Sequence, residues 1–504
     1  AIGRNAGLVL TSGTYNFIAG NAAYALTSGS HNVAIGSSAL AAATTTSYNI
    51  AIGRNALAVA IDDSEQNIAI GYTALGAADV SGDSNIAIGS YSADVVTSGA
   101  NNVAIGYASY SAATTGQSNV SIGYQSMYSG NTVGHRNVAL GECTLYTLGN
   151  SCDNVAIGWK AMSAATIACH NVAIGTCALG AGNMLCAGSS QAEYNVAIGG
   201  QPLQNLTTGN DNIALGTLAG GFRTTGKCDV LIGYKAGWCS LNGEQNVAVG
   251  PYAYSQSKGD GNYNVAIGSY AMGQGDTDGE DNIAIGRVSM DVLTTGACNI
   301  AIGPDALGAG TTGCYNIALG ASALILSTTG KDNIGIGRSA LAGADVTGCG
   351  NMAMGTSAAD AMTLGLDNIA IGKNALGAST TSCNNIAIGN AALSAALVKS
   401  GSDDACNNIA IGSNSADALT TGYENIAIGV NALGAATNNN MNVAIGCGAM
   451  ASTVNDGDDG IAIGKGAMGQ GDVSGDQNIA IGRNAGLVLT SGTYNFIAGN
   501  AAYA

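Results

Sequence analysis

A short pattern of alternating apolar residues recurs along the whole chain. In Asn67-Ile68-Ala69-Ile70-Gly71, two branched residues flank an alanine, and an asparagine and a glycine bound the segment. Alternation with a period of two predicts a β-strand in which Ile68 and Ile70 point to one face and Ala69 points to the other. Gly71 has no Cβ, so it permits a sharp corner at positive φ after the strand.

The spacing of this motif predicts the fold. Its asparagine, here called the anchor, returns in steps of 17 or 18 residues, apart from one step of 16 at the start and two longer steps. Steps of this length are too short for helical repeats and suit one coil of a β-solenoid, while glycine every few residues disfavours helices. The sequence therefore predicts an all-β fold, a parallel β-solenoid of 17–18-residue coils that forms a single continuous array over residues 1–504.

Other parts of the repeat predict corners and loops. A small residue and a leucine or methionine follow the glycine, as at Ala74-Leu75, and we expect them to form a second short strand. A polar turn, often Thr-Thr-Gly, closes the coil. Two longer steps contain insertions near 180–192 and 394–405, and these should be surface loops because the next motif is intact.

The anchor asparagines predict a side-chain ladder. Equivalent side chains in stacked coils lie about 4.8 Å apart, and amides at that spacing hydrogen-bond to one another. The alternative is that each asparagine only supports the turn before its strand. Asp229 and Gly460 replace the asparagine and should be local weak points. The predicted ladder includes Asn32, Asn49, Asn67, Asn85, Asn102, Asn154, Asn171, Asn212, Asn282, Asn299, Asn368, Asn385, Asn425 and Asn478.

Neither face of the motif strand is polar. One face carries the branched pair and the other carries alanine in almost every copy. Strands that are apolar on both faces are generally buried on both. One face can fill the coil, and we expect the branched pair to do so. The alanine face then needs a second surface, most simply that of another chain. We expect a homotrimer, with a single-chain solenoid or an end-to-end filament as the alternatives.

Composition and charge exclude several classes of function. The chain has 77 Gly but only 3 Phe and 2 Trp, which fits a thin core of small and branched side chains. A net charge of −17 argues against nucleic-acid binding, which needs clustered Lys and Arg. Apolar runs are all too short for a membrane span, so we expect no membrane insertion in this segment.

The 13 cysteines indicate an oxidising compartment and therefore an extracellular or cell-surface location. Cys152 and Cys169 each precede their anchor by two residues, as do Cys383 and Cys406, so each pair should stack in adjacent coils within disulfide range. Pairings of Cys143 with Cys152 and of Cys177 with Cys186 are the alternatives within one coil.

Candidate chemistry is sparse, and we expect no enzyme and no cofactor. The three histidines, His31, His135 and His170, lie in turns without a partner at metal-ligand spacing. Acidic turns are better explained by solvation than by Ca²⁺, for which the weak candidates are Asp276, Asp278, Asp458 and Asp476. Of two glycosylation sequons, the one at Asn205 should be the more accessible, because Asn119 is an anchor.

Tyrosines gather near the corners, as at Tyr72, Tyr107, Tyr124, Tyr234 and Tyr270. They either cover the coil edge or form a surface on which sugars stack.

The motif resembles the head repeats of trimeric autotransporter adhesins, the YadA-type or Hep/Hag family. Asn102-Val103-Ala104-Ile105-Gly106 and Asn442-Val443-Ala444-Ile445-Gly446 match the core of that family's motif directly. The longer repeat is also similar to repeats in secreted bacterial and phage-fibre proteins. This resemblance implies a left-handed β-roll, three chains around one axis and an adhesive or spacer role. The coil here is longer than the family's, and no coiled-coil stalk or membrane barrel accompanies it.

The two ends of the chain share one sequence. Residues 1–25 and 480–504 are identical, so a shift of 479 residues superimposes one end on the other. We expect a tandem array of a 479-residue unit, with a terminal duplication as the alternative.

Together these features predict a structural or adhesive subunit of an extracellular filament or surface stalk. A glycan- or receptor-binding fibre shaft, like that of a phage tail fibre, is the alternative.

Overall fold

A computed structural model describes residues 1–60, 64–76, 80–111, 114–129, 134–147, 149–164, 168–180, 192–259, 261–343, 345–395, 397, 405–454 and 457–500. The chain divides into two compact units, residues 1–260 and 261–504. All regular elements of the described residues are three-residue β-strands, and no helix occurs among them.

Each motif of the repeat forms one strand. The first unit contains β1 (Phe17–Ala19), β2 (Val33–Ile35), β3 (Ile50–Ile52), β4 (Ile68–Ile70), β5 (Ile86–Ile88), β6 (Val103–Ile105), β7 (Val120–Ile122), β8 (Val138–Leu140), β9 (Val155–Ile157), β10 (Val172–Ile174), β11 (Val196–Ile198), β12 (Ile213–Leu215), β13 (Val230–Ile232) and β14 (Val247–Val249). The second contains β15 (Val265–Ile267), β16 (Ile283–Ile285), β17 (Ile300–Ile302), β18 (Ile317–Leu319), β19 (Ile334–Ile336), β20 (Met352–Met354), β21 (Ile369–Ile371), β22 (Ile386–Ile388), β23 (Ile409–Ile411), β24 (Ile426–Ile428), β25 (Val443–Ile445), β26 (Ile461–Ile463), β27 (Ile479–Ile481) and β28 (Phe496–Ala498).

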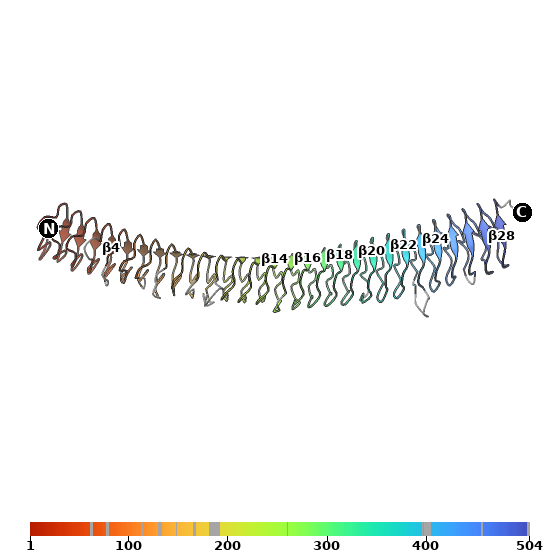
Figure 1. The fold of residues 1–504 in the computed structure, drawn as a ribbon, viewed down its shortest axis with the longest axis horizontal. Helices are drawn as coiled ribbons and strands as arrows, with labels where there is room; N and C mark the ends of the chain where they lie inside the picture. The colour runs from red at the N-terminus through yellow and green to blue at the C-terminus, as the bar shows by residue number, and fades with distance from the viewer. Residues whose placement is uncertain are drawn as a thin grey trace. The chain divides into compact units, whose positions relative to one another are not determined.

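Within each unit every strand pairs in parallel with the strand of the next coil, as the successive arrows in Figure 1 show. The register places equivalent residues opposite one another: Ala69 of β4 lies opposite Ala87 of β5. In the second unit Ala284 of β16 lies opposite Ala301 of β17. The prediction of a parallel β-solenoid of 17–18-residue coils is confirmed.

The interior of each coil is narrow and is filled by small residues and leucine. The alanine at the centre of the motif strand points inward, and Ala69 and Ala301 are both 0% exposed. Leu75, eight residues after its anchor, and Leu293, eleven residues after its anchor, are also fully buried. Methionine or tyrosine replaces leucine in some coils, as at Met272 and Tyr110.

This arrangement shows which face of the strand fills the coil. We had expected the branched pair to be buried inside and alanine to need the second surface. Instead the branched residues face outward, and Ile302 remains 41% exposed. The leucine columns fill most of the coil, so a small side chain fits beneath the strand in most coils. Leu231 of β13 is also buried at this position, where Gly220 and Gly237 take the place of the column leucine beside it.

The corner after the strand contains a turn instead of the second strand expected around Ala74 and Leu75. Gly71 adopts a φ of 141°, and Thr73 and Leu75 adopt left-handed φ values of 55° and 47°. Alternating left-handed residues curl the chain too tightly for an extended strand. Coil-to-coil bonding still continues, since the Leu75 N–H donates to the Ser92 carbonyl at 3.0 Å. The cores of the insertions, residues 181–191, 396 and 398–404, lie outside the described residues.

Candidate functional site

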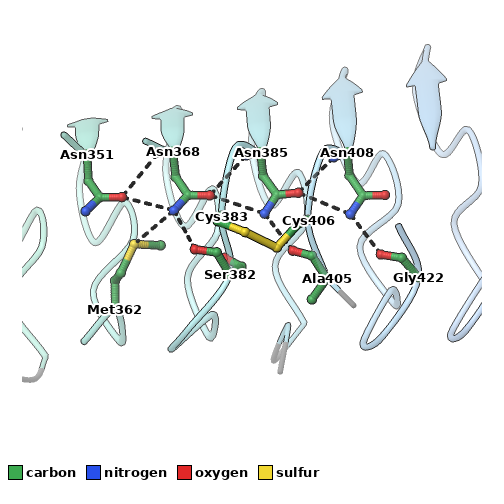
Figure 2. The surroundings of a disulfide bond; sticks show 10 residues. All are labelled: Asn351, Met362, Asn368, Ser382, Cys383, Asn385, Ala405, Cys406, Asn408 and Gly422. Atoms are coloured by element: carbon green, nitrogen blue, oxygen red, sulfur yellow. Dashed lines mark hydrogen bonds between the residues drawn. A yellow bond between two sulfur atoms is a disulfide. The ribbon is translucent and has the colours of Figure 1, made fainter. Parts of the chain in front are cut away.

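The anchor asparagines form the predicted ladder. Asn385 Oδ1 accepts hydrogen bonds from both the backbone N–H and the side-chain Nδ2 of Asn408, at 2.9 and 3.1 Å. Asn408 Nδ2 also donates to the carbonyl of Gly422, three residues before the next anchor, at 2.8 Å. Figure 2 shows these amides in a column below the strands, each joined to its neighbours. All fourteen predicted ladder residues are buried, so each amide satisfies backbone groups that water cannot reach.

At Asp229 the ladder continues by a different route. The Asp229 N–H donates to Asn212 Oδ1 at 3.2 Å, and Asp229 Oδ1 accepts from the Asn246 N–H at 2.8 Å. A carboxylate cannot donate to the carbonyl of Gly243 as an amide would. Arg223 does so in its place: Nη2 pairs with Asp229 Oδ2 and donates to the Gly243 carbonyl.

Arg223 occupies an interior position. It lies eleven residues after its anchor, where the preceding coil has the buried Leu206, and both partners of the ion pair are 0% exposed. Burial lowers the pKa of Arg223 and raises the pKa of Asp229, while their mutual attraction opposes both shifts. Asp229 was predicted to be a local weak point, but its partner Arg223 was not predicted. At Gly460 the backbone N–H still donates to Asn442 Oδ1, but there is no side chain to extend the ladder.

The acidic turns form a second, external ladder. In these turns the residue two before the anchor has a polar side chain. That side chain accepts a hydrogen bond from the backbone N–H of the residue at the same position in the preceding coil. Asp458 accepts from the Asn440 N–H at 2.7 Å, and Asp476 accepts from the Asp458 N–H at 3.2 Å. His135 fills the same place through Nδ1, which accepts from the Gln117 N–H. Within the described ranges no three His, Cys, Asp or Glu side chains gather to hold a metal ion, and this includes the Ca²⁺ candidates Asp276, Asp278, Asp458 and Asp476.

The two cysteine pairs stack in adjacent coils, but only one is bonded. Cys383 and Cys406 form a disulfide beside the asparagine column, with their Cα atoms 4.8 Å apart (Figure 2). Cys152 and Cys169 are thiols whose sulfurs are 2.9 Å apart. Of the pairings within one coil, Cys143 is also a thiol, and Cys186 lies outside the described residues.

The sequon asparagines are both engaged in hydrogen bonds. Asn119 is a buried anchor. Asn205 is half-buried, and its Nδ2 donates to the Gly221 carbonyl at 2.8 Å. A glycan on Asn205 would have to replace that bond.

The outward residues of the motif strands form a continuous apolar surface in each unit, here called the branched face. It consists of the first and third residues of each strand, such as Ile409 and Ile411 of β23. Their exposure is intermediate in most coils, and it reaches 42% at Ile481 and 69% at Phe496. Each unit therefore presents two rows of partly exposed apolar side chains along its motif strands, whereas the largest apolar patch on a typical monomer covers only a few hundred Å².

Tyrosines form a column along the corners of β4–β7. Ring centroids lie 5.2 Å apart for Tyr72–Tyr91, 5.9 Å for Tyr91–Tyr107 and 5.4 Å for Tyr107–Tyr124. The first two pairs meet edge-to-face and the third is stacked, and both arrangements are favourable. The rings keep one face or edge in solvent, since their exposure ranges from 37% to 50%.

A groove of about 510 Å³ lies beside this column, over the coils of β5, β6 and β7. Its small central residues are Ala108 and Ser111, in the coil of β6. Tyr91 and Asp94 flank them on one side, and Gln125 and Tyr128 flank them on the other. Burial raises the pKa of the Asp94 carboxyl to about 6. Its Oδ1 is buried and has no hydrogen-bond partner.

Comparison with known proteins adds no assignment. No protein-family model matches the chain, and no curated protein matches it. Among the described residues we find no helix with the length and hydropathy to cross a membrane.

Proposed function

We propose that the chain is a structural and adhesive subunit of an extracellular filament or surface stalk, and that copies associate through the branched face. The observation that carries this proposal is the outward position of the branched residues. Selection for solubility alone would favour Thr, Lys or Glu at these positions, yet Ile, Val, Leu or Met occupies nearly all of them in both units. A repeating apolar row is best covered by another row with the same spacing, which a second copy supplies.

Two further features support this role. Neighbouring coils are tied by backbone bonds and, except at Asp229 and Gly460, by a buried anchor amide, so load along the axis is shared by several bonds at each step. The disulfide between Cys383 and Cys406 joins neighbouring coils and suits an oxidising environment outside the cell. We expect three chains to meet at the branched face.

The test is to place charge on the branched face in three consecutive coils. The variant Ile411→Lys, Ile428→Lys, Ile445→Lys should be monomeric in analytical ultracentrifugation, whereas the wild-type chain should be trimeric. The matched control is Ser413→Lys, Val430→Lys, Cys447→Lys, which adds the same charge two residues further along the same coils, where the side chains are exposed. A monomeric wild-type protein at high micromolar concentration would refute self-association. Equal loss of assembly in both variants would refute the role of this face.

The alternative function, a glycan-binding shaft, is favoured by one specific observation, the groove beside the tyrosine column.

A further inference from the structure

The groove over β5–β7 arises from a local change of side-chain size. Tyr91, Ala108 and Gln125 occupy the same position, six residues after their anchors, in three successive coils. Asp94, Ser111 and Tyr128 are equivalent in the same way, nine residues after theirs. The middle coil has the small member of each row, so a hollow two coil spacings wide, about 10 Å, opens between larger neighbours.

We propose that this groove binds a neutral saccharide, with one sugar ring seated over Ala108 between Tyr91 and Tyr128 and one hydroxyl donating to Asp94. The apolar C–H face of a sugar ring packs on the electron-rich face of a tyrosine. The other lining groups are an amide and hydroxyls, which can both donate to and accept from sugar hydroxyls. This inference deepens the alternative function and does not depend on self-association.

The Asp94 carboxylate supplies the hydrogen-bond acceptor of the groove, whose wall it lines. Its Oδ1 is buried without a partner, as is Oδ1 of Asp291 at the same coil position, so this atom alone does not mark a ligand site. What distinguishes Asp94 is its place on the groove wall, whereas Asp291 Oδ2 is bonded within the protein and accepts from Gln274 Nε2 at 2.7 Å. A sugar hydroxyl is a donor of suitable size. Anionic sugars are excluded, because the carboxylate and the net charge of −17 repel them.

The experiment measures binding of neutral tetrasaccharides of glucose, galactose and N-acetylglucosamine to the full chain by calorimetry and saturation-transfer NMR. Choline and sialyllactose serve as the cationic and anionic probes. At least one neutral tetrasaccharide should bind. Tyr91→Ala and Asp94→Asn should each weaken that binding by about tenfold or more.

The chain offers matched controls in its second unit. Tyr270 has the same coil position and the same 37% exposure as Tyr91, and Asp417 is the equivalent of Asp94. Tyr270→Ala and Asp417→Asn should leave binding unchanged. Ala108→Tyr places in the hollow a residue that the same position holds in the coil of β5, so it should fold normally and abolish binding.

Three results would overturn the proposal: no neutral tetrasaccharide binds at millimolar concentration, choline or sialyllactose binds in their place, or binding survives in Ala108→Tyr. None of them bears on assembly through the branched face, because the ultracentrifugation test is independent of these residues.

Discussion

The buried pair of Arg223 and Asp229 permits a quantitative test of the ladder. Two substitutions restore the pattern of other coils: Asp229→Asn supplies the anchor amide, and Arg223→Leu supplies the interior leucine seen at Leu206. Each single substitution removes one partner of a fully buried ion pair and leaves the other charge uncompensated. Breaking such a pair costs about 3–5 kcal/mol, whereas replacing both members by a well-packed neutral pair is often neutral or stabilising by about 1–4 kcal/mol.

Hydrogen exchange followed by mass spectrometry suits this test, because a repeat array opens locally and has no single unfolding free energy. Peptides that cover β12–β14 should exchange about 10²- to 10⁴-fold faster in each single variant. In the double variant they should exchange at the wild-type rate or more slowly. Peptides over β20–β22 serve as the internal control and should not change.

A strong coupling energy between the two sites is therefore expected. If the loss of opening free energy in the double variant equals the sum of the losses in the two single variants, Arg223 does not replace the missing amide donor. If Asp229→Asn alone exchanges like the wild type, the buried guanidinium needs no carboxylate, and the compensation argument is refuted.

Four further outcomes are expected. Asn299→Ala leaves the buried Gly313 carbonyl and Asn316 N–H unpaired, at a cost of about 2–4 kcal/mol. Exchange in β17 and β18 should rise accordingly, and exchange at the wild-type rate would contradict the ladder. Gly71→Ala places a Cβ 2.5 Å from the Gly89 carbonyl oxygen, at a backbone φ of 141°, and should disrupt the pairing of β4 with β5. The control is Gly200→Ala, which should be tolerated because its Cβ meets only the Thr217 side chain at 3.5 Å. Reduction of the disulfide between Cys383 and Cys406 should speed exchange in β22 and β23 selectively, and detection of both as free thiols by peptide mapping of the untreated protein would contradict it. Because the pKa of Asp94 is raised to about 6, its contribution to stability is greatest in acid and is lost as the pH rises through 6. The protection factors near β5, which are corrected for the intrinsic pH dependence of exchange, should therefore fall over that range, and an identical profile in Asp94→Asn would rule this out.

The sequence was sufficient to predict the coil, the strand and the asparagine ladder, because each follows from a repeated spacing. It could not show which face of the strand lies inside. A period of two places Ile68 and Ala69 on opposite faces, but both residues are apolar. The choice depends on the space left by leucines such as Leu75, which is a property of the folded coil.

Other features depend on conformation or on pairs of residues that depart from the repeat. Thr73 and Leu75 have ordinary side chains, so their left-handed φ values, and the loss of the expected second strand, had no signal in residue type. Arg223 could have been found: a charge stands at a position that holds small or apolar residues in other coils, such as Leu206 and Ser240, and it lies six residues before the anchor that is Asp229. The groove could not be found, since Ala108 forms a hollow only because Tyr91 and Gln125 stack on either side of it.

The most direct test of assembly through the branched face is a cryo-electron microscopy cross-section of the particle, in which the chains around the axis can be counted. We predict three chains, with the outward residues of the motif strands, such as Ile302 and Ile411, at the contact between them. A single solenoid in cross-section, with these residues facing solvent along its length, would contradict the proposal.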